Sequence, residues 1–258
     1  MSSISCISLF SGAGGLDLGL EAAGMESSLI TDIDFHSCQT LIANQHELRS
    51  KGRGLLASAE VVQADIREVE GKELLRRTGL KRGELDVLAG GPPCQAFSVF
   101  GQRKGTLDPR GQLVFHYLRI LGDLAPRSFI LENVFGMLTV EGGAVMEALV
   151  EQLSNPRRGL KYDISVVRLN SANFGVPQFR DRVFIIGSRT GSNVSSVDPT
   201  FGPPNELPPG LLPWRTVRDA FRGLPVMGDP SISNHTGRNH SQRIVDRYAS
   251  MSPGERDS

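Results

Sequence analysis

The stretch Gly90-Gly91-Pro92-Pro93-Cys94-Gln95-Ala96-Phe97-Ser98 constrains this chain more than any other. The mostly apolar run 85–89 before it predicts a buried strand, which the glycines and prolines end abruptly. In open α/β sheets, ligands and chemistry collect at the carboxyl ends of strands. Cys94 is therefore a candidate nucleophile, because rigid prolines hold it and free backbone amides there would favour the thiolate. A buried structural cysteine is the alternative reading.

The composition is that of an ordinary globular protein, with 258 residues and a formal net charge of +0. The chain as a whole therefore lacks the excess of positive charge that is typical of nucleic-acid-binding proteins, although a local basic patch is compatible with this balance. Three cysteines, Cys6, Cys38 and Cys94, lack metal-ligand spacing, so we expect a reduced, cytoplasmic protein without a metal site. We find neither a signal peptide nor an apolar run long enough to span a membrane.

The amino-terminal segment predicts a strand, a glycine turn and a helix in succession. Residues 4–10 are apolar, residues 11–15 read Ser-Gly-Ala-Gly-Gly, and residues 16–23 have helical spacing. This arrangement lets backbone approach a nucleotide-like ligand closely. An ordinary tight turn would explain the glycines equally well.

Acidic residues follow three predicted strands. The strand at 28–31 ends at Asp32, the strand at 61–63 leads to Asp65, and the strand at 128–131 ends at Glu132. An acid in such a place is suited to accept hydrogen bonds from ribose hydroxyls. Together with the glycine turn after the first strand, Asp32 and Asp65 after the next two make an adenosine pocket the economical interpretation. Asp32 or Asp34 can also cap the helix predicted over residues 35–44.

The second half of the domain contains a predicted strand pair, residues 163–169 and 182–186. Arg180 and Arg182 precede or open the second of these, one residue apart, so they point the same way and could hold a phosphate or a carbonyl. A solvated face is the alternative. The glycine-hinged basic stretch 96–112 could close over an anionic substrate, or be a surface loop.

The character of the chain changes near residue 190, where prolines become frequent. We expect one short helix within residues 214–224 and no packed core for the polar tail 234–258. The predicted organisation is a catalytic domain over residues 1–190 and a proline-rich polar extension over residues 191–258.

Four ordered motifs resemble those of the cytosine carbon-5 DNA methyltransferases: Phe10-Ser11-Gly12-Ala13-Gly14-Gly15, Pro92-Pro93-Cys94-Gln95, Glu132-Asn133-Val134 and Gln178-Phe179-Arg180-Asp181-Arg182. The resemblance runs from Ile4 to about Leu224. It implies an α/β, Rossmann-like S-adenosylmethionine-dependent methyltransferase fold, with a mostly parallel twisted sheet and helices on both faces. It also implies S-adenosyl-L-methionine as methyl donor, a cytosine flipped out of double-stranded DNA as acceptor, and a place in a restriction-modification system of the prokaryotic cytoplasm or nucleoid.

The same resemblance implies roles for residues at the cofactor. Phe10 and Ile33 would pack on adenine, Asp32 would bind the ribose and Asp65 the adenine amine. The remaining expected cofactor contacts are Gly12, Ala13 and Gly14 at the methionine end, with Ile66, Pro93 and Leu113 nearby.

The expected catalytic set is Cys94, Glu132, Arg180 and Arg182. Attack of the Cys94 thiolate on cytosine carbon 6 would turn carbon 5 into an enamine able to take the methyl group. A protonated Glu132 would stabilise ring nitrogen 3 and accept from the exocyclic amine. Arg182 would hold the carbonyl oxygen, and Arg180 would brace Glu132 or a phosphate. The loop at 96–112 would close behind the flipped base.

The chain departs from the family pattern after Leu224, where the target-recognition region and final motifs of single-chain members are not found. The missing last helix predicts an exposed apolar flank beside the first strand that needs a cover. We therefore expect one subunit of a split enzyme, completed by a second polypeptide. The alternatives are a truncated or inactive form, a non-catalytic partner-binding module, an unrelated dinucleotide oxidoreductase, and an RNA-methylating relative. The target DNA sequence cannot be read from this chain.

Overall fold

The computed structural model describes residues 3–50, 56–93, 113–191, 193–225, 228–232, 235–237 and 239–252, without the side chains of residues 48–50 and 141. It divides the chain into two compact units, Met1–Trp214 and Arg215–Ser258. The sequence predicted a catalytic domain that ends at residue 190 and an extension from residue 191. The two compact units do not test this functional division, which stays a prediction.

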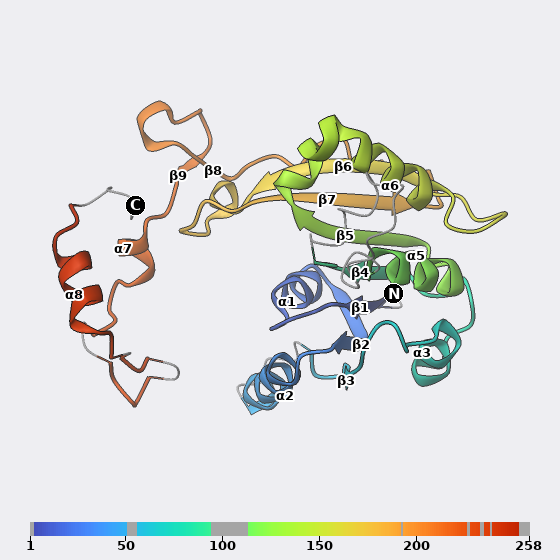
Figure 1. Cartoon of the computed structure of the whole chain (residues 1–258), viewed down its shortest axis with the longest axis horizontal. Helices are drawn as coiled ribbons and strands as arrows, with labels where there is room; N and C mark the ends of the chain where they lie inside the picture. Colours follow the sequence, from blue (N-terminus) through green and yellow to red (C-terminus); the bar gives the residue numbers. More distant parts are fainter. Residues whose placement is uncertain are drawn as a thin grey trace. The chain divides into compact units, whose positions relative to one another are not determined.

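The first unit is built on a seven-stranded sheet in the order β3-β2-β1-β4-β5-β7-β6. Strands β1 to β5 run parallel, and β7 is antiparallel to both of its neighbours. The mostly parallel α/β architecture predicted from the sequence is thus confirmed (Figure 1). The strands are β1 (Ile4–Leu9), β2 (Met25–Asp32), β3 (Glu60–Gln63), β4 (Val87–Gly90), β5 (Ser128–Val134), β6 (Asp163–Asn170) and β7 (Asp181–Ser188).

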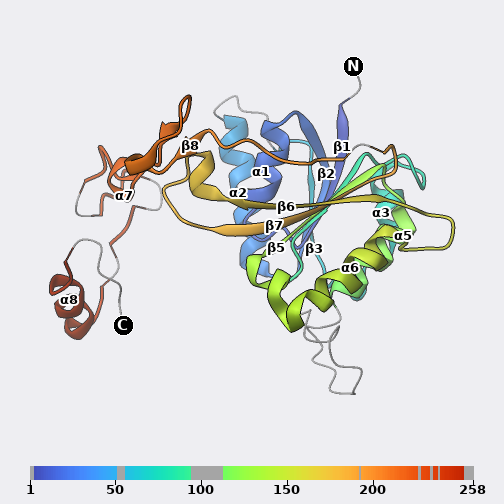
Figure 2. The same cartoon turned by 90° about the horizontal axis from the view of Figure 1, so that it is seen from above.

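Helices cover the sheet from both sides. Figure 2 shows α1 and α2 on one side and α3, α5 and α6 on the other. Their bounds are α1 (Gly15–Ala22), α2 (Phe35–Ser50), α3 (Gly71–Thr78), α5 (Leu113–Leu124) and α6 (Ala144–Ser154).

The main core lies under α5 and α6, where Phe129 makes edge-to-face contacts with Tyr117 and Tyr162. The Phe129 ring occupies space that a side chain at Gly187 would need, since a Cβ there would lie 2.0 Å from the ring. Glycine on β7 therefore permits the fully buried Phe129 ring to pack against the sheet.

The order of the strands creates a topological switch point between β1 and β4. From β1 the chain moves outward to β2 and β3, and then returns to place β4 on the other side of β1. The two strands are in register up to Leu9 and Gly90, so their connections leave the sheet side by side and in opposite directions. Such a place is where open α/β sheets bind ligands.

Strand β5 is longer than the sequence predicted. The expected end was Leu131, but pairing with β7 continues to Val134, opposite Arg182. Glu132 therefore lies within the strand rather than after it. The antiparallel partner supplies the extra hydrogen bonds, and that partner is distant in the sequence.

The segment after β6 forms a small substructure at the end of the sheet where β5 and β6 stop. It contains the 3₁₀ helix η4 (Ser171–Phe174) and a two-stranded parallel ribbon of β8 (Phe201–Gly202) and β9 (Leu212–Pro213). Two further 3₁₀ helices are η3 (Phe135–Gly143) and η5 (Pro204–Glu206).

The second unit contains α7 (Val217–Ala220) and α8 (Gln242–Ala249). Helix α7 begins with a capping box in which Thr216 and Asp219 exchange hydrogen bonds. Neither helix has a buried residue, in agreement with the expectation that the tail lacks a core of its own. None of the helices in the described residues combines the length and the apolar character that a membrane crossing requires.

Candidate active site

A first cavity of about 390 Å³ opens where β1 to β4 end. Seven of the ten predicted cofactor residues line it, although they come from five separate parts of the chain. These residues are Phe10, Asp32, Ile33, Asp65, Ile66, Pro93 and Leu113. The fold therefore brings together most of the set expected to hold the nucleoside.

Asp32 connects the end of β2 to the glycine turn after β1. Its Oδ2 accepts a hydrogen bond of 2.7 Å from the Gly12 amide, and its Oδ1 accepts one of 2.9 Å from the Asp34 amide. Asp34 in turn accepts from the Ser37 amide at 2.7 Å and caps α2. The capping role considered for the two aspartates thus falls to Asp34, and Asp32 retains lone pairs.

The glycine turn contributes its two ends, Ser11 and Gly15, to the second cavity, but not its middle. None of Gly12, Ala13 and Gly14 lines either of the two cavities described in this section. Gly14 has a φ of 84°, and a Cβ there would lie 2.5 Å from the Leu41 side chain on α2. Glycine at this position therefore allows α1 and α2 to approach each other.

Asp65 has a partner that sequence reasoning did not single out. The Arg67 side chain donates from Nε to both Asp65 carboxylate oxygens, at 2.8 and 2.9 Å, and from Nη2 to Oδ2. This guanidinium lowers the pKa of the Asp65 carboxyl. Arg67 itself lines the first cavity. Its position two residues after the acid was the signal available in the sequence.

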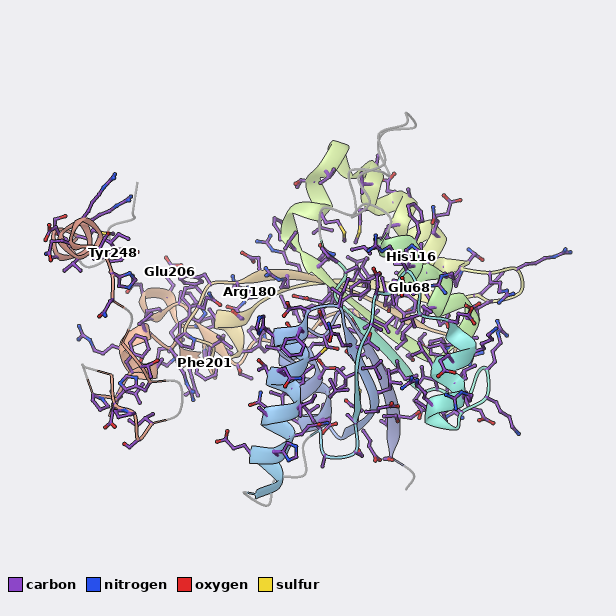
Figure 3. All side chains as sticks on the ribbon, turned by 60° about the horizontal axis from the view of Figure 1, so that its bottom comes forward. Glu68, His116, Arg180, Phe201, Glu206 and Tyr248 are labelled. Atoms are coloured by element: carbon purple, nitrogen blue, oxygen red, sulfur yellow. The ribbon has the colours of Figure 1, made fainter. Side chains whose placement is uncertain are left out.

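A second cavity, of about 550 Å³, adjoins the first and shares Phe10 and Gly91 with it. It contains three of the four predicted catalytic residues, Glu132, Arg180 and Arg182. Figure 3 labels Arg180 at this cavity and His116 on α5, well apart from it. The remaining wall is largely apolar and includes Leu16, Leu20, Phe174, Val176 and Phe184.

Glu132 is paired with Arg182 inside the second cavity. The distance from Arg182 Nε to Glu132 Oε1 is 2.8 Å, and both side chains are mostly buried. We expected Arg180 to brace either Glu132 or a phosphate, and strand register gives the contact with Glu132 to Arg182 instead. Arg182 stands opposite Val134, so its side chain lies on the same face of the sheet as Glu132. Arg180 precedes β7 and is exposed at the cavity wall.

Cys94 lies outside the described residues, whereas Pro92 before it is described and is anchored by a side chain. The buried side chain of Asn133 donates a 2.8 Å hydrogen bond from Nδ2 to the Pro92 carbonyl, two residues before Cys94. Asn133 Oδ1 accepts from the Val134 amide at 2.8 Å, which fixes the orientation of the side-chain amide. The sequence indicated Asn133 as part of a motif, but not this role.

The other two cysteines are free and buried. Burial raises the pKa of the Cys6 thiol to about 12 and also raises that of Cys38, so neither is suited to act as a thiolate at neutral pH. Among the described residues, no group of three or more His, Cys, Asp or Glu side chains is placed to hold a metal ion.

Comparisons with known proteins agree with this architecture. The family model for the C-5 cytosine-specific DNA methylases matches residues 4–256. The chain is 39% identical over 251 residues to the Type II methyltransferase M.AquIA of Picosynechococcus sp., covering 93% of this chain and 96% of that protein. The chain therefore belongs to the C-5 cytosine-specific DNA methylase family.

Other relatives are longer. The Type II methyltransferase M.FnuDI of Fusobacterium nucleatum is 35% identical, and the match covers 74% of this chain and 49% of that protein. A crystal structure of a DNA modification methyltransferase encoded within an E. coli prophage superposes with a TM-score of 0.70 at 26% identity, covering 98% of this chain and 77% of that one. The S. pombe Dnmt2 methyltransferase, at 22% identity and a TM-score of 0.51, shares the fold.

Proposed function

We propose that this chain is the catalytic subunit of a DNA (cytosine-5)-methyltransferase that uses S-adenosyl-L-methionine. The observation that carries the proposal is the meeting of two cavities at Phe10 and Gly91. The first cavity contains Asp32 and Asp65, which are expected to bind a nucleoside. The second contains the acid and the two arginines that are expected to act on a cytosine. A methyl donor and an acceptor base bound in adjoining cavities would face each other across this shared wall.

The first cavity fits the adenosine part of the cofactor. Asp32 can accept from ribose hydroxyls, since its two present hydrogen bonds leave lone pairs on both oxygens. Asp65, held by Arg67, can accept from the adenine amine. Phe10 and Ile33 provide apolar surface for the ring, with Ile66, Pro93 and Leu113 beside it. Bound S-adenosylmethionine supplies an electrophilic methyl group.

The proposed nucleophile is Cys94. Its thiolate would add to carbon 6 of the flipped cytosine, and the electron pair of the 5,6 double bond would become available at carbon 5 for the methyl group. Loss of the carbon 5 proton would then expel the Cys94 thiolate and restore the double bond. The hydrogen bond from Asn133 to Pro92 would hold the turn that presents this thiol.

Glu132 and Arg182 would stabilise the ring during that attack. The Oε1 of Glu132 is occupied by Arg182, whereas its Oε2 faces Gly91, near the start of the Cys94 turn. This second oxygen is the one placed to meet the edge of a base. Glu132 must carry a proton to support ring nitrogen 3, while Arg182 is near enough to hold the carbonyl oxygen as well. Arg180 would bind a phosphate at the rim.

The second polypeptide remains part of the proposal. The second cavity has an apolar wall made by α1, β7 and the η4 region, in which Val176 is 45% exposed. Such a surface favours a cover that the described residues do not supply. The similarity to the Type II methyltransferase M.AquIA supports the methyltransferase part of the proposal. A cytoplasmic or nucleoid location and double-stranded DNA as substrate complete the proposal.

The test is transfer of labelled methyl groups to cytosine-containing DNA. One arm uses this chain alone, and the other adds the product of the neighbouring reading frame. Activity in the combined arm alone supports a split enzyme, whereas activity of the single chain removes the need for a partner. Cys94→Ser should abolish turnover and leave S-adenosylmethionine binding nearly intact. Turnover that survives this substitution would exclude the proposed adduct, and cofactor binding without transfer in both arms would favour an inactive or regulatory protein.

A further inference from the structure

An aromatic recess lies at the end of the β6–β7 pair, on the opposite face of that ladder from the second cavity, because Arg168 and Leu169 point to opposite faces. It has a volume of about 420 Å³ and is lined by Arg168, Asn170, Asn173, Phe179, Asp181 and Trp214. Phe179 and Trp214 meet edge to face, with ring centroids 4.9 Å apart and an interplanar angle of 86°. The Phe179 side chain is nevertheless 69% exposed, the largest exposed fraction among the large hydrophobic residues described.

This exposed ring is held in place rather than loosely attached. The Ser171 amide donates to the Arg180 carbonyl at 3.1 Å, and the Ser171 hydroxyl donates to the Gln178 carbonyl at 2.7 Å. Both residues flanking Phe179 are therefore fixed by one serine. A rigid aromatic side chain loses little conformational entropy when a ligand binds, which is typical of a contact surface.

Trp214 is fixed in a similar way. Its indole Nε1 donates to the Asn173 side chain at 3.0 Å, and its backbone amide donates to the Gly202 carbonyl at 2.9 Å. The turn beneath it depends on Gly175, since a Cβ there would lie 2.7 Å from the Phe201 ring. The recess is thus a preformed feature of the first unit.

The location of the recess points to its occupant. Phe179 directly precedes Arg180, and Arg180 lines the cavity that would receive the flipped cytosine. Asn170 and Asp181 form the last pair of the β6–β7 ladder, at the end of the sheet where β5 also stops. The rim carries side-chain amides and the Arg168 guanidinium, which pairs with Asp181 and lies 3.8 Å from the Phe135 ring centroid. Aromatic faces with such donors suit nucleotides.

We propose that Phe179, supported by Trp214, stacks on a nucleotide that neighbours the target cytosine and so helps to hold the DNA from which that base is extruded. Extrusion removes the stacking partner of the adjacent base, and an aromatic ring can replace it. The inference rests on the proposed function, because it requires DNA at the second cavity.

The test compares Phe179→Ala, Phe179→Tyr and the control Val197→Ala, whose parent side chain is 43% exposed. The assay is methyl transfer under the condition in which the unsubstituted protein is active. Phe179→Ala should raise the KM for DNA about tenfold, in keeping with the loss of one stacked base. The affinity for S-adenosylmethionine should stay within twofold, and Phe179→Tyr and the control should behave like the parent.

A second readout uses Trp214, which is the one tryptophan of the chain. Incorporation of 5-fluorotryptophan gives a single ¹⁹F resonance that reports on the recess even when an unlabelled partner is present. Duplex DNA containing cytosine should shift this resonance, and the shift should be lost in Phe179→Ala.

The outcomes separate the two proposals. An unchanged KM for DNA in Phe179→Ala, with a wild type that methylates normally, would overturn the stacking role and leave the proposed function standing. A resonance that shifts when the second polypeptide is added without DNA would identify the recess as a protein interface. That result would also overturn the stacking role. A wild type that never methylates DNA would instead remove the proposed function.

Discussion

The side-chain amide of Asn133 donates a hydrogen bond of 2.8 Å to the carbonyl oxygen of Pro92. This contact joins the strand that carries Glu132 to the turn that precedes Cys94. Two groups expected to act on the same base are thereby connected through one buried residue, which is 4% exposed. The contact therefore fixes Pro92, two residues before Cys94, relative to the strand of Glu132.

Asn133→Asp should reduce turnover about 10- to 100-fold with little effect on S-adenosylmethionine affinity. A carboxylate cannot donate to the Pro92 carbonyl, and an unsatisfied buried group costs about 1–3 kcal/mol. Steady-state kinetics and thermal denaturation measure the two effects. Asn155→Asp, at the exposed end of α6, is the matched control and should be neutral. Full turnover in Asn133→Asp would show that the turn is held by other contacts.

Gly91→Ala should impair both turnover and the binding of S-adenosylmethionine. A Cβ at Gly91 would lie 3.0 Å from Glu132 Oε2, and Gly91 lines both cavities. We expect at least a tenfold loss of kcat and a weaker affinity for S-adenosylmethionine, the latter measured by calorimetry. Gly136→Ala is the control, because nothing lies within 4 Å of a Cβ there. A loss of cofactor affinity with an unchanged kcat would mean that the Glu132 side chain can move away from the added methyl group and still perform its role.

Asp32→Asn should weaken S-adenosylmethionine binding about tenfold. The substitution removes the negative charge that accepts from the Gly12 amide and leaves one acceptor oxygen where there were two. Asp34→Asn is the internal control: Asp34 caps α2, and asparagine caps a helix about as well as aspartate. Equal affinities in the two variants would contradict a role of Asp32 at the ribose.

Asp17→Asn should raise the Tm at neutral pH. The Asp17 side chain is fully buried on α1, and its Oδ2 has no hydrogen-bond partner within the described part of the chain. Burial raises the pKa of this carboxyl above its usual 3.8, so the folded state binds the proton more tightly than the unfolded state does. The native protein therefore loses stability as the pH rises above about 4 toward the folded pKa.

The expected gain of Asp17→Asn accordingly appears above about pH 4 and vanishes below it, where the parent carboxyl is neutral in both states. Each kcal/mol regained corresponds to about 2–4 °C in Tm for a protein of this size. Thermal denaturation of both proteins at several pH values measures it. A variant less stable than the parent at neutral pH would contradict this expectation and show that contacts such as that with Ser11 stabilise the carboxylate.

The sequence by itself determined the family, the α/β class and the positions of most strands along the chain. Local signals were sufficient here, because apolar runs end at Gly, Pro or acidic residues, as at Asp32 and after Gly90. It also indicated seven of the residues that line the first cavity, since the carboxyl ends of parallel strands meet at one edge of a sheet. The roles of these residues stay predictions.

Only the tertiary structure decided which residues touch. The antiparallel register of β5 and β7 placed Arg182, and not Arg180, against Glu132, and it carried β5 three residues further to Val134. Two hydrogen bonds likewise depend on side-chain directions: the one from Arg67 to Asp65 and the one from Asn133 to the Pro92 carbonyl. Sequence periodicity records which face a residue occupies, but strand register and side-chain rotamers, fixed by packing between distant segments, select its partner.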